Sequence, residues 1–476
     1  MRRFNSVIIF LFLILFAFPN FSSAQYRKLK RKINRIVSDE NLKDGFAGIL
    51  IYDLSRNRTV YSYNSEKLFT PASNQKILTT AAALYFLPKN YEFSTYVRIT
   101  GPVVDSVLYG DIVIKGTGDP LFTTDDLFAL VDSVKRVGIK LVKGKLIGDV
   151  GWCDSLYFGS GWMWDDAYYG FMPYLSPLIL NKARLKIEVK PTKPNRLASV
   201  NFLDSLSDFP LANYVLTIKE DSSNFDVYRN YLKHKNSFYS DGFISASAKP
   251  DTSTLNIINP DLYFLRTFRK ICKNNNIKIT GATELRRNVP YVSELFGISH
   301  SLDSVIVETN KESENINAEM LLRALAAEYY GEPATAQNGI KMIDSLISLS
   351  GNTPRNFILV DGSGLSRYNL ISPKLIVDVF KFLRKKSPQK FNALINSFPV
   401  AGLDGTLQKR MTNGKAFKNV QAKTGTMTAV SALSGIVKNR RGRKFLFSMM
   451  MQNYSAKTSS IRKLQDKICE SLARSK

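Results

Sequence analysis

The chain has 476 residues, of which 44% are hydrophobic, and its 66 Lys and Arg outnumber its 40 Asp and Glu to give a formal net charge of +26. This length predicts two or three domains with well-buried cores. The three scattered cysteines, Cys153, Cys272 and Cys469, exclude a disulfide-stapled scaffold, and with only two histidines they argue against a transition-metal site. Buried free thiols are the expectation, with one bridge as the alternative.

The first 24 residues have the features of a secretory signal peptide. Arg2 and Arg3 precede an apolar run from Val7 to Phe18, and small residues follow at Ser22-Ser23-Ala24. The run is shorter than the roughly 20 residues that span a bilayer, so we predict cleavage after residue 24, with an uncleaved anchor as the alternative. An exported protein this basic is expected near anionic surfaces of the cell envelope and not on nucleic acid. The alternative is that the positive charge serves only to keep the protein soluble.

The N-terminal segment after this signal alternates between helical and strand-like patterns. A basic amphipathic helix is expected over residues 26–37, followed by two strands at 46–52 and 59–63 and a helix at 77–87. This last helix places Ser73 at its N-terminal end.

The middle of the chain, from about residue 92 to 296, changes to short strand-like runs and many turn residues. Strands are expected at 110–115, 140–142, 145–148, 185–190 and 255–258, with helices at 125–137 and 262–275. The last part predicts helices at 318–330, 334–348, 373–385 and 458–472, and a β-meander over 420–423, 432–438 and 444–452. Helices flanking an antiparallel sheet predict an α+β fold.

Three short motifs stand in a fixed order: Ser73-Asn-Gln-Lys76, Ser313-Glu-Asn315 and Lys423-Thr-Gly425-Thr426. Each motif alone is a weak signal. Together they form the S-x-x-K, S-x-N, K-T-G set of serine enzymes that are acylated by penicillin and by D-Ala-D-Ala peptides.

A serine hydroxyl needs a base to become a good nucleophile, and Lys76 shares a helix face with Ser73. Lysine acts as a base only when burial or another cation lowers its pKa, and Lys423 is a candidate for that second cation. Ser313 is a candidate proton relay, and Asn315 can hold a substrate carbonyl. The alternatives are a solvated helix lysine at position 76 and simple helix capping by Ser313 or Asn315.

The K-T-G run is expected on an edge strand, where Lys423, Thr424 and Thr426 suit a free carboxylate and Gly425 permits close approach of a substrate backbone. The backbone N–H groups of Ser73 and Thr426 are candidates for an oxyanion hole. A plain hairpin turn is the alternative for this run.

The motifs and their spacing resemble those of the class C low-molecular-mass (type 4) penicillin-binding proteins, the D-alanyl-D-alanine carboxypeptidase/endopeptidase family. Ser73 and Ser313 are 240 residues apart, a gap that in this family holds two inserted domains. Further family-like strings are Ser313-Glu-Asn-Ile-Asn-Ala-Glu319, Asp361-Gly-Ser-Gly-Leu-Ser-Arg367, Ala401-Gly-Leu-Asp-Gly-Thr406 and Gly161-Trp-Met-Trp-Asp-Asp166. The resemblance covers essentially residues 40–455.

The resemblance implies a penicillin-recognising, β-lactamase-like catalytic domain with two nested inserted domains. The expected boundaries are 25–96 and 295–476 for the catalytic domain, 97–184 and 251–294 for the first insert, and 185–250 for the second. It also implies that Trp164, Asp165 and Asp166 border the cleft and that one of the carboxylates contacts the amine end of a diaminopimelate side chain. A surface aromatic turn is the alternative for these three residues.

The function implied is that of an exported, periplasmic or envelope-associated serine D,D-peptidase. Ser73, Lys76 and Ser313 would be catalytic, and the peptidoglycan stem peptide would bind Asn315, Lys423, Thr424, Gly425 and Thr426. β-Lactams would be covalent inhibitors, and no metal or organic cofactor is expected. Two alternatives remain open: a β-lactamase, which deacylates rapidly, and a slow penicillin- or muropeptide-binding sensor.

Overall fold

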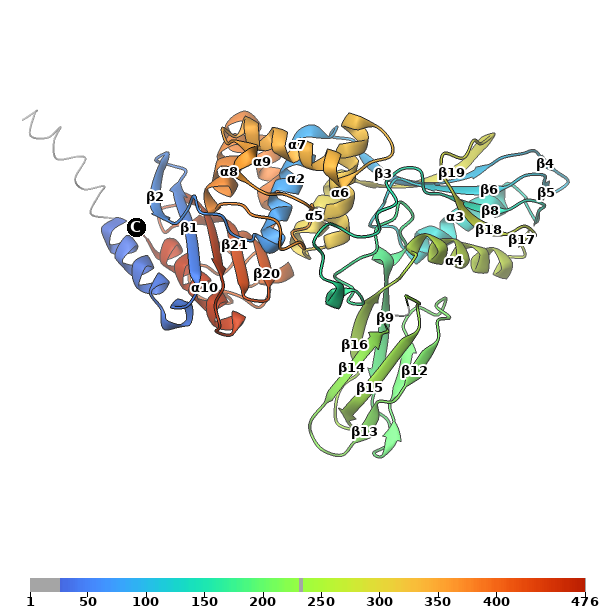
Figure 1. Cartoon of the computed structure of the whole chain (residues 1–476), viewed down its shortest axis with the longest axis horizontal. Helices are drawn as coiled ribbons and strands as arrows, with labels where there is room; N and C mark the ends of the chain where they lie inside the picture. The colour runs from blue at the N-terminus through green and yellow to red at the C-terminus, as the bar shows by residue number, and fades with distance from the viewer. Residues whose placement is uncertain (1–25, 231–233, 476) are drawn as a thin grey trace, which may run out of the picture.

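The computed structural model describes residues 26–230 and 234–475, which fold into three lobes (Figure 1). Both ends of the chain build the first lobe, and the middle of the chain builds the other two. The predicted signal peptide, residues 1–24, lies outside the described residues. Within the described part, no helix combines the length and the apolar character needed to cross a membrane.

The first lobe is centred on a five-stranded antiparallel sheet in the order β2-β1-β22-β21-β20. Its strands are β1 (Phe46–Asp53), β2 (Arg58–Tyr63), β20 (Gln421–Met427), β21 (Val430–Lys438) and β22 (Lys444–Gln452). Successive side chains point to opposite faces, and both faces are buried: Met449 joins one apolar core and Met450 the other. The N-terminal hairpin therefore completes a sheet begun by the C-terminal strands.

Helices cover both faces of this sheet (Figure 1). The helix over residues 26–37 and α10 (Thr458–Arg474) share one core with it. The opposite face packs against a helical layer made of α2 (Gln75–Phe86), α5 (Leu302–Lys311), α6 (Asn315–Tyr330), α7 (Ala336–Leu349), α8 (Pro373–Lys386) and α9 (Pro388–Asn396). The predicted S-x-x-K helix is α2, which lies inside this layer and is buried along almost its whole length.

The second lobe has a mixed sheet in the order β18-β8-β6-β3-β19. The strands are β3 (Glu92–Ile99), β6 (Ile112–Gly116), β8 (Leu146–Asp149), β18 (Thr283–Arg286) and β19 (Ser293–Ser301). Residues of α3 (Thr124–Arg136) and α4 (Pro260–Asn274) share its core. A smaller sheet contains β4 (Val103–Val104), β5 (Val107–Leu108), β7 (Leu141–Val142) and β17 (Lys278–Ile279).

The third lobe consists of strands and projects away from the other two (Figure 1). One sheet pairs β11 (Ser199–Phe202), β9 (Arg184–Lys190) and β16 (Asp251–Asn256). The other contains β10 (Arg196–Leu197), β12 (Leu211–Asn213), β13 (Leu216–Ile218), β14 (Asn224–Arg229) and β15 (Phe238–Ser245).

The expected helices and the C-terminal meander are present within a few residues of their predicted bounds. The sequence reading missed α5, α9, the two long strands β3 and β19, and most strands of the third lobe. Cys153, Cys272 and Cys469 are buried and form no disulfide, which confirms the expectation of free thiols.

The domain boundaries stay a prediction. The boundaries at 96/97 and 294/295 fall inside β3 and β19, which pair with each other from Glu92↔Ser301 to Ile99↔Ser293. We therefore propose that the first insert begins and ends with these two whole strands. The chain then leaves the first lobe and returns to it at adjacent points, because Glu92 and Ser301 are paired.

Candidate active site

Ser73 lies in a short 3-10 turn, Ala72–Asn74, that runs directly into α2. Its neighbours Ala72, Asn74 and Lys76 are buried, whereas Ser73 is partly exposed. Ala72 has a left-handed φ of 47°, a conformation that is unfavourable for a residue with a Cβ and that is concentrated at functional sites. This turn presents the Ser73 hydroxyl at the end of an otherwise buried helix.

Lys76 is fully buried and its ammonium nitrogen has three acceptors. Nζ donates to Ser73 Oγ at 3.1 Å, to Asn315 Oδ1 at 2.6 Å and to the Ser363 carbonyl oxygen at 2.6 Å. Burial lowers the pKa of Lys76 to about 8, although the charges of Asp361, Glu319 and Glu314 oppose the shift. Roughly a tenth of the molecules then carry a neutral amine at pH 7, which can accept a proton from Ser73.

The Ser313 motif lies between α5 and α6, opposite the S-x-x-K turn. Ser313 has a left-handed φ of 64°, and its Oγ accepts a hydrogen bond from Lys423 Nζ at 2.8 Å. Asn315 is the first residue of α6, and its Nδ2 donates to the Phe171 carbonyl oxygen at 2.6 Å. The alternative that Ser313 or Asn315 caps the helix is wrong. The N-cap residue of α6 is Glu314, which makes no side-chain capping bond.

Lys423 lies on the edge strand β20 and is also fully buried. Besides Ser313, its Nζ donates to the Thr424 carbonyl oxygen at 3.0 Å. Burial, and then repulsion from Lys76, hold the pKa of Lys423 well below its usual value. Burial is the largest cause of the lowered pKa of Lys76, and because the repulsion between the two buried ammonium groups is mutual, each opposes protonation of the other.

Gly425 brings β20 against the serine turn. A Cβ at this position would lie 2.7 Å from the Pro71 carbonyl oxygen and 3.1 Å from the Ser73 nitrogen, so a larger residue would push the strand away. The flanking hydroxyls are held as well: Thr424 Oγ1 donates to Thr406 Oγ1 at 2.8 Å, and Thr426 Oγ1 accepts from Arg462 Nη2 at 2.9 Å. The three motifs thus meet at one site, joined by the Lys76–Asn315 and Lys423–Ser313 hydrogen bonds and by the close approach of Gly425 to Ser73.

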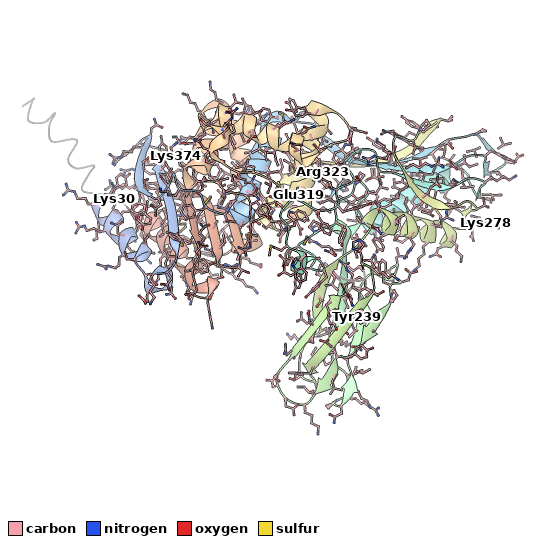
Figure 2. The ribbon with its side chains drawn as sticks, viewed as in Figure 1. Lys30, Tyr239, Lys278, Glu319, Arg323 and Lys374 are labelled. Atoms are coloured by element: carbon pink, nitrogen blue, oxygen red, sulfur yellow. The ribbon has the colours of Figure 1, made fainter. Side chains whose placement is uncertain are left out.

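A buried loop over residues 361–366 supports Lys76. This role was not predicted from the sequence. Asp361 accepts hydrogen bonds from the Gly364 and Ser366 N–H groups at 2.8 and 2.7 Å. Glu319, buried on α6 beside Arg323 (Figure 2), accepts from the Gly362 and Ser363 N–H groups at 3.0 and 2.8 Å. These bonds fix the Ser363 carbonyl that receives Lys76.

The aromatic and acidic segment forms a short 3-10 helix, Trp164–Asp166. Trp164 is 65% exposed, and with Trp162 it lines a cavity of about 270 Å³. Burial, and then Asp165, raise the pKa of Asp166, whereas Arg367 lowers it. Arg367 donates to the Thr428 carbonyl oxygen beyond the K-T-G run.

This segment is linked to the active-site loop by one side chain next to it. Trp162 Nε1 donates to Asp361 Oδ2 at 3.0 Å. Within residues 26–230 and 234–475, the hydrogen-bonded group around Ser73 and Lys76 includes neither Asp165 nor Asp166.

Residues 29–474 match the model of the D-Ala-D-Ala carboxypeptidase 3 (S13) family. The chain belongs to this family. D-alanyl-D-alanine carboxypeptidase DacB of Haemophilus influenzae is 28% identical over 453 residues, covering 94% of this chain and 92% of the relative. The D-alanyl-D-alanine carboxypeptidase of Actinomadura sp. (strain R39) is 29% identical over 455 residues, covering 92% and 84%.

The crystal structure of penicillin binding protein 4 (dacB) from Haemophilus influenzae superposes with a TM-score of 0.82 at 26% identity, covering 93% of this chain and 99% of that one. A second structure of that protein is complexed with a β-lactam and has a TM-score of 0.77 at 24% identity. The resemblance drawn from the sequence and the α+β fold class of the penicillin-recognising serine enzymes are confirmed. The activity supported by the family is that of a D-alanyl-D-alanine carboxypeptidase.

Gly364 offers a test of how the supporting loop positions Ser73. Its φ is 76°, and an added Cβ would overlap the Ala72 carbonyl oxygen next to the serine. We expect Gly364→Ala to lower hydrolysis of a diacyl D-Ala-D-Ala peptide by at least about tenfold and the free energy of unfolding by about 3 kcal/mol.

Gly351→Ala is the matched control, because Gly351 has a φ of 83° and a Cβ there would meet no atom within 4 Å. It should lower the free energy of unfolding by only about 1 kcal/mol and leave hydrolysis unchanged. Urea unfolding and peptide hydrolysis measure both quantities. Equal effects of the two substitutions would mean that the contact with Ala72 does not position Ser73.

Proposed function

We propose that the protein is an exported serine D,D-peptidase that trims and cuts peptidoglycan stem peptides. The observation that carries this proposal is the buried Lys76 ammonium, which lies 3.1 Å from Ser73 Oγ in the same cleft as the Ser313–Lys423 pair. Its lowered pKa makes Lys76 the base that the serine needs.

In the acylation step, Ser73 Oγ attacks the carbonyl of the penultimate D-alanine. The Oγ–C bond forms, the C–N bond to the leaving residue breaks, and Lys76 takes the hydroxyl proton. Ser313 then relays this proton from Lys76 to the leaving amine, which restores Lys76 and Ser313, while backbone N–H groups of Ser73 and Thr426 stabilise the oxyanion. Water attacks the acyl-enzyme in the second step and restores Ser73.

The K-T-G strand would bind the carboxylate next to the bond that breaks. Lys423 supplies a cation and the Thr424 and Thr426 hydroxyls supply donors, and all three come from one edge strand. Asn315 already bonds Lys76 and the Phe171 carbonyl, so it would orient the substrate backbone between the first lobe and the inserted segment. β-Lactams, whose carboxylate and carbonyl imitate the substrate, would acylate Ser73.

The position of the Trp164–Asp166 segment supports the choice of a peptidoglycan substrate. Trp164, Asp165 and Asp166 lie beside the loop that supports Lys76, where a carboxylate can attract the amine of a diaminopimelate side chain. When a cross-link is cut, the leaving group is the corresponding amine of the second stem, so carboxypeptidase and endopeptidase reactions share one acyl-enzyme.

The helix over residues 26–37 supports a location at the anionic cell envelope. It exposes Arg27, Lys28, Lys30, Arg31, Lys32 and Arg35 and contains no acidic residue. Lys30 projects from the outer end of the first lobe (Figure 2). Six cations on one exposed face favour binding to anionic head groups or polymers.

Digestion of purified sacculi tests the proposed function. We expect the mature protein to release D-alanine from pentapeptide stems and to convert cross-linked dimers to monomers, and chromatography of the muropeptides measures both. Ser73→Ala should do neither, since it removes the nucleophile. Release of D-alanine with all dimers intact would contradict the endopeptidase activity, and no change in either would contradict the proposal as a whole.

The pH dependence tests what activates Lys76. Its neutral form increases as the pH rises through its pKa of about 8, so kcat/KM on a diacyl D-Ala-D-Ala peptide should rise over the same range. Lys423→Met removes the second cation but keeps the site filled. Because the charge of Lys423 also opposes protonation of Lys76, we expect a loss of at least about tenfold at pH 7, with the rise displaced to higher pH and part of the activity recovered there.

Lys423→Arg is the control that retains a charge at this position, and it should lose less activity than Lys423→Met. A loss in Lys423→Met that is equal at every pH, with the midpoint of the rise unchanged, would show instead that burial alone sets the pKa of Lys76.

A further inference from the structure

A cavity of about 560 Å³ opens between the 3-10 helix Gly405–Leu407 with the residues that follow it and the first turns of α10. Its lining includes four cationic residues, Lys409, Arg410, Arg462 and Lys463, and one acidic residue, Asp466. The catalytic residues Ser73, Lys76 and Ser313 are not among the residues that line it. It is a separate site beside the cleft.

Two hydrogen bonds join this cavity to the strand that would hold the substrate carboxylate. Arg462, from its α10 side, donates to Thr426 Oγ1 at 2.9 Å. Thr406, from the opposite side, accepts from Thr424 Oγ1 at 2.8 Å. The cavity therefore begins where the K-T-G run ends, and a substrate that continued past the carboxylate would enter it.

The positive charge in the cavity is only partly compensated. Asp466 accepts from Arg410 Nε at 3.1 Å and from Nη2 at 2.7 Å, which engages the acidic group of the lining. Within the described residues, Lys409, Arg462 and Lys463 form no ion pair. Burial, then repulsion from Arg410, lower the pKa of Arg462. A set of cations held together in this way favours an anionic ligand.

We propose that this cavity binds the acidic stem peptide that leaves when a peptide cross-link is cut, through its free carboxylate. This inference rests on the proposed D,D-peptidase function. In a cross-linked dimer the leaving amine belongs to a diamino acid, whose adjacent carboxylate would occupy the Thr424 and Thr426 site. The same stem continues to a γ-linked glutamate with its own α-carboxylate, which Lys409 and Lys463 are placed to receive. A single terminal D-alanine has no group that reaches them.

The test compares the double variant Lys409→Gln/Lys463→Gln with the unaltered enzyme on two substrates. One is a cross-linked tetrapeptide dimer with a free glutamate α-carboxylate, and the other is a diacyl D-Ala-D-Ala peptide. We expect kcat/KM on the dimer to fall about fivefold to tenfold more than on the small peptide, which corresponds to two exposed ion pairs. The difference should shrink as NaCl increases, because salt screens exposed charges.

Lys467→Gln is the matched control, since Lys467 is exposed, lies one turn further along α10 and does not line the cavity. It should leave both rates unchanged. A dimer whose glutamate α-carboxylate is amidated provides the control on the substrate, and with it the selective loss in the double variant should vanish.

Other outcomes distinguish failure of this inference from failure of the proposed D,D-peptidase function. Equal losses on both substrates, or a selective loss that persists with the amidated dimer, would overturn the inference while leaving the D,D-peptidase function intact. If the unaltered enzyme cleaves neither substrate, the proposed function fails, and the inference fails with it.

Discussion

The burial of the Lys76 ammonium is the interaction on which the rest of the catalytic lobe depends. A buried charged group must be hydrogen-bonded or lose its charge. Lys76 shows both effects, because its ammonium has hydrogen-bond acceptors and its pKa is lowered. Its three acceptors come from the serine turn, from the first residue of α6 and from the loop at Ser363. One nitrogen atom thus fixes the relative positions of three segments that are far apart in the sequence. The same burial lowers its pKa to about 8, so the fold and the proposed chemistry have one physical cause.

The antiparallel sheet supplies the other wall of the cleft. β20 is an edge strand that pairs along its length with β21, and beyond a bridge between Gln421 and Val400 its second edge faces the serine turn. Gly425 permits that approach. β3 and β19 are paired from Glu92↔Ser301 to Ile99↔Ser293, so the ends of the chain segment that builds the second and third lobes lie next to each other. This segment contributes to the site through Phe171, which accepts from Asn315, and through Trp162, which donates to Asp361.

The sequence revealed the parts of the site that have a local signature. The spacing of Ser73 and Lys76, the helical pattern of α2 and the strand-like apolar runs of β21 and β22 are all encoded within a few residues. The Ser363 carbonyl could not be predicted, because any residue has a carbonyl group and its position depends on Asp361 and Glu319. The pairing of β3 with β19 joins residues about 200 positions apart, and the short strands of the third lobe have too few residues for a clear period. The lowered pKa of Lys76 was expected, but its cause could be assigned only once its burial was known.

We propose that Ser73 is the nucleophile and that buried Lys76 activates it. The most direct measurement is to incubate the mature protein with a penicillin of known mass, digest it and locate the adduct by mass spectrometry. We expect one penicillin per protein, attached to the peptide that contains Ser73, and no adduct in Ser73→Ala. An adduct on another serine, or one that persists in Ser73→Ala, would contradict the assignment.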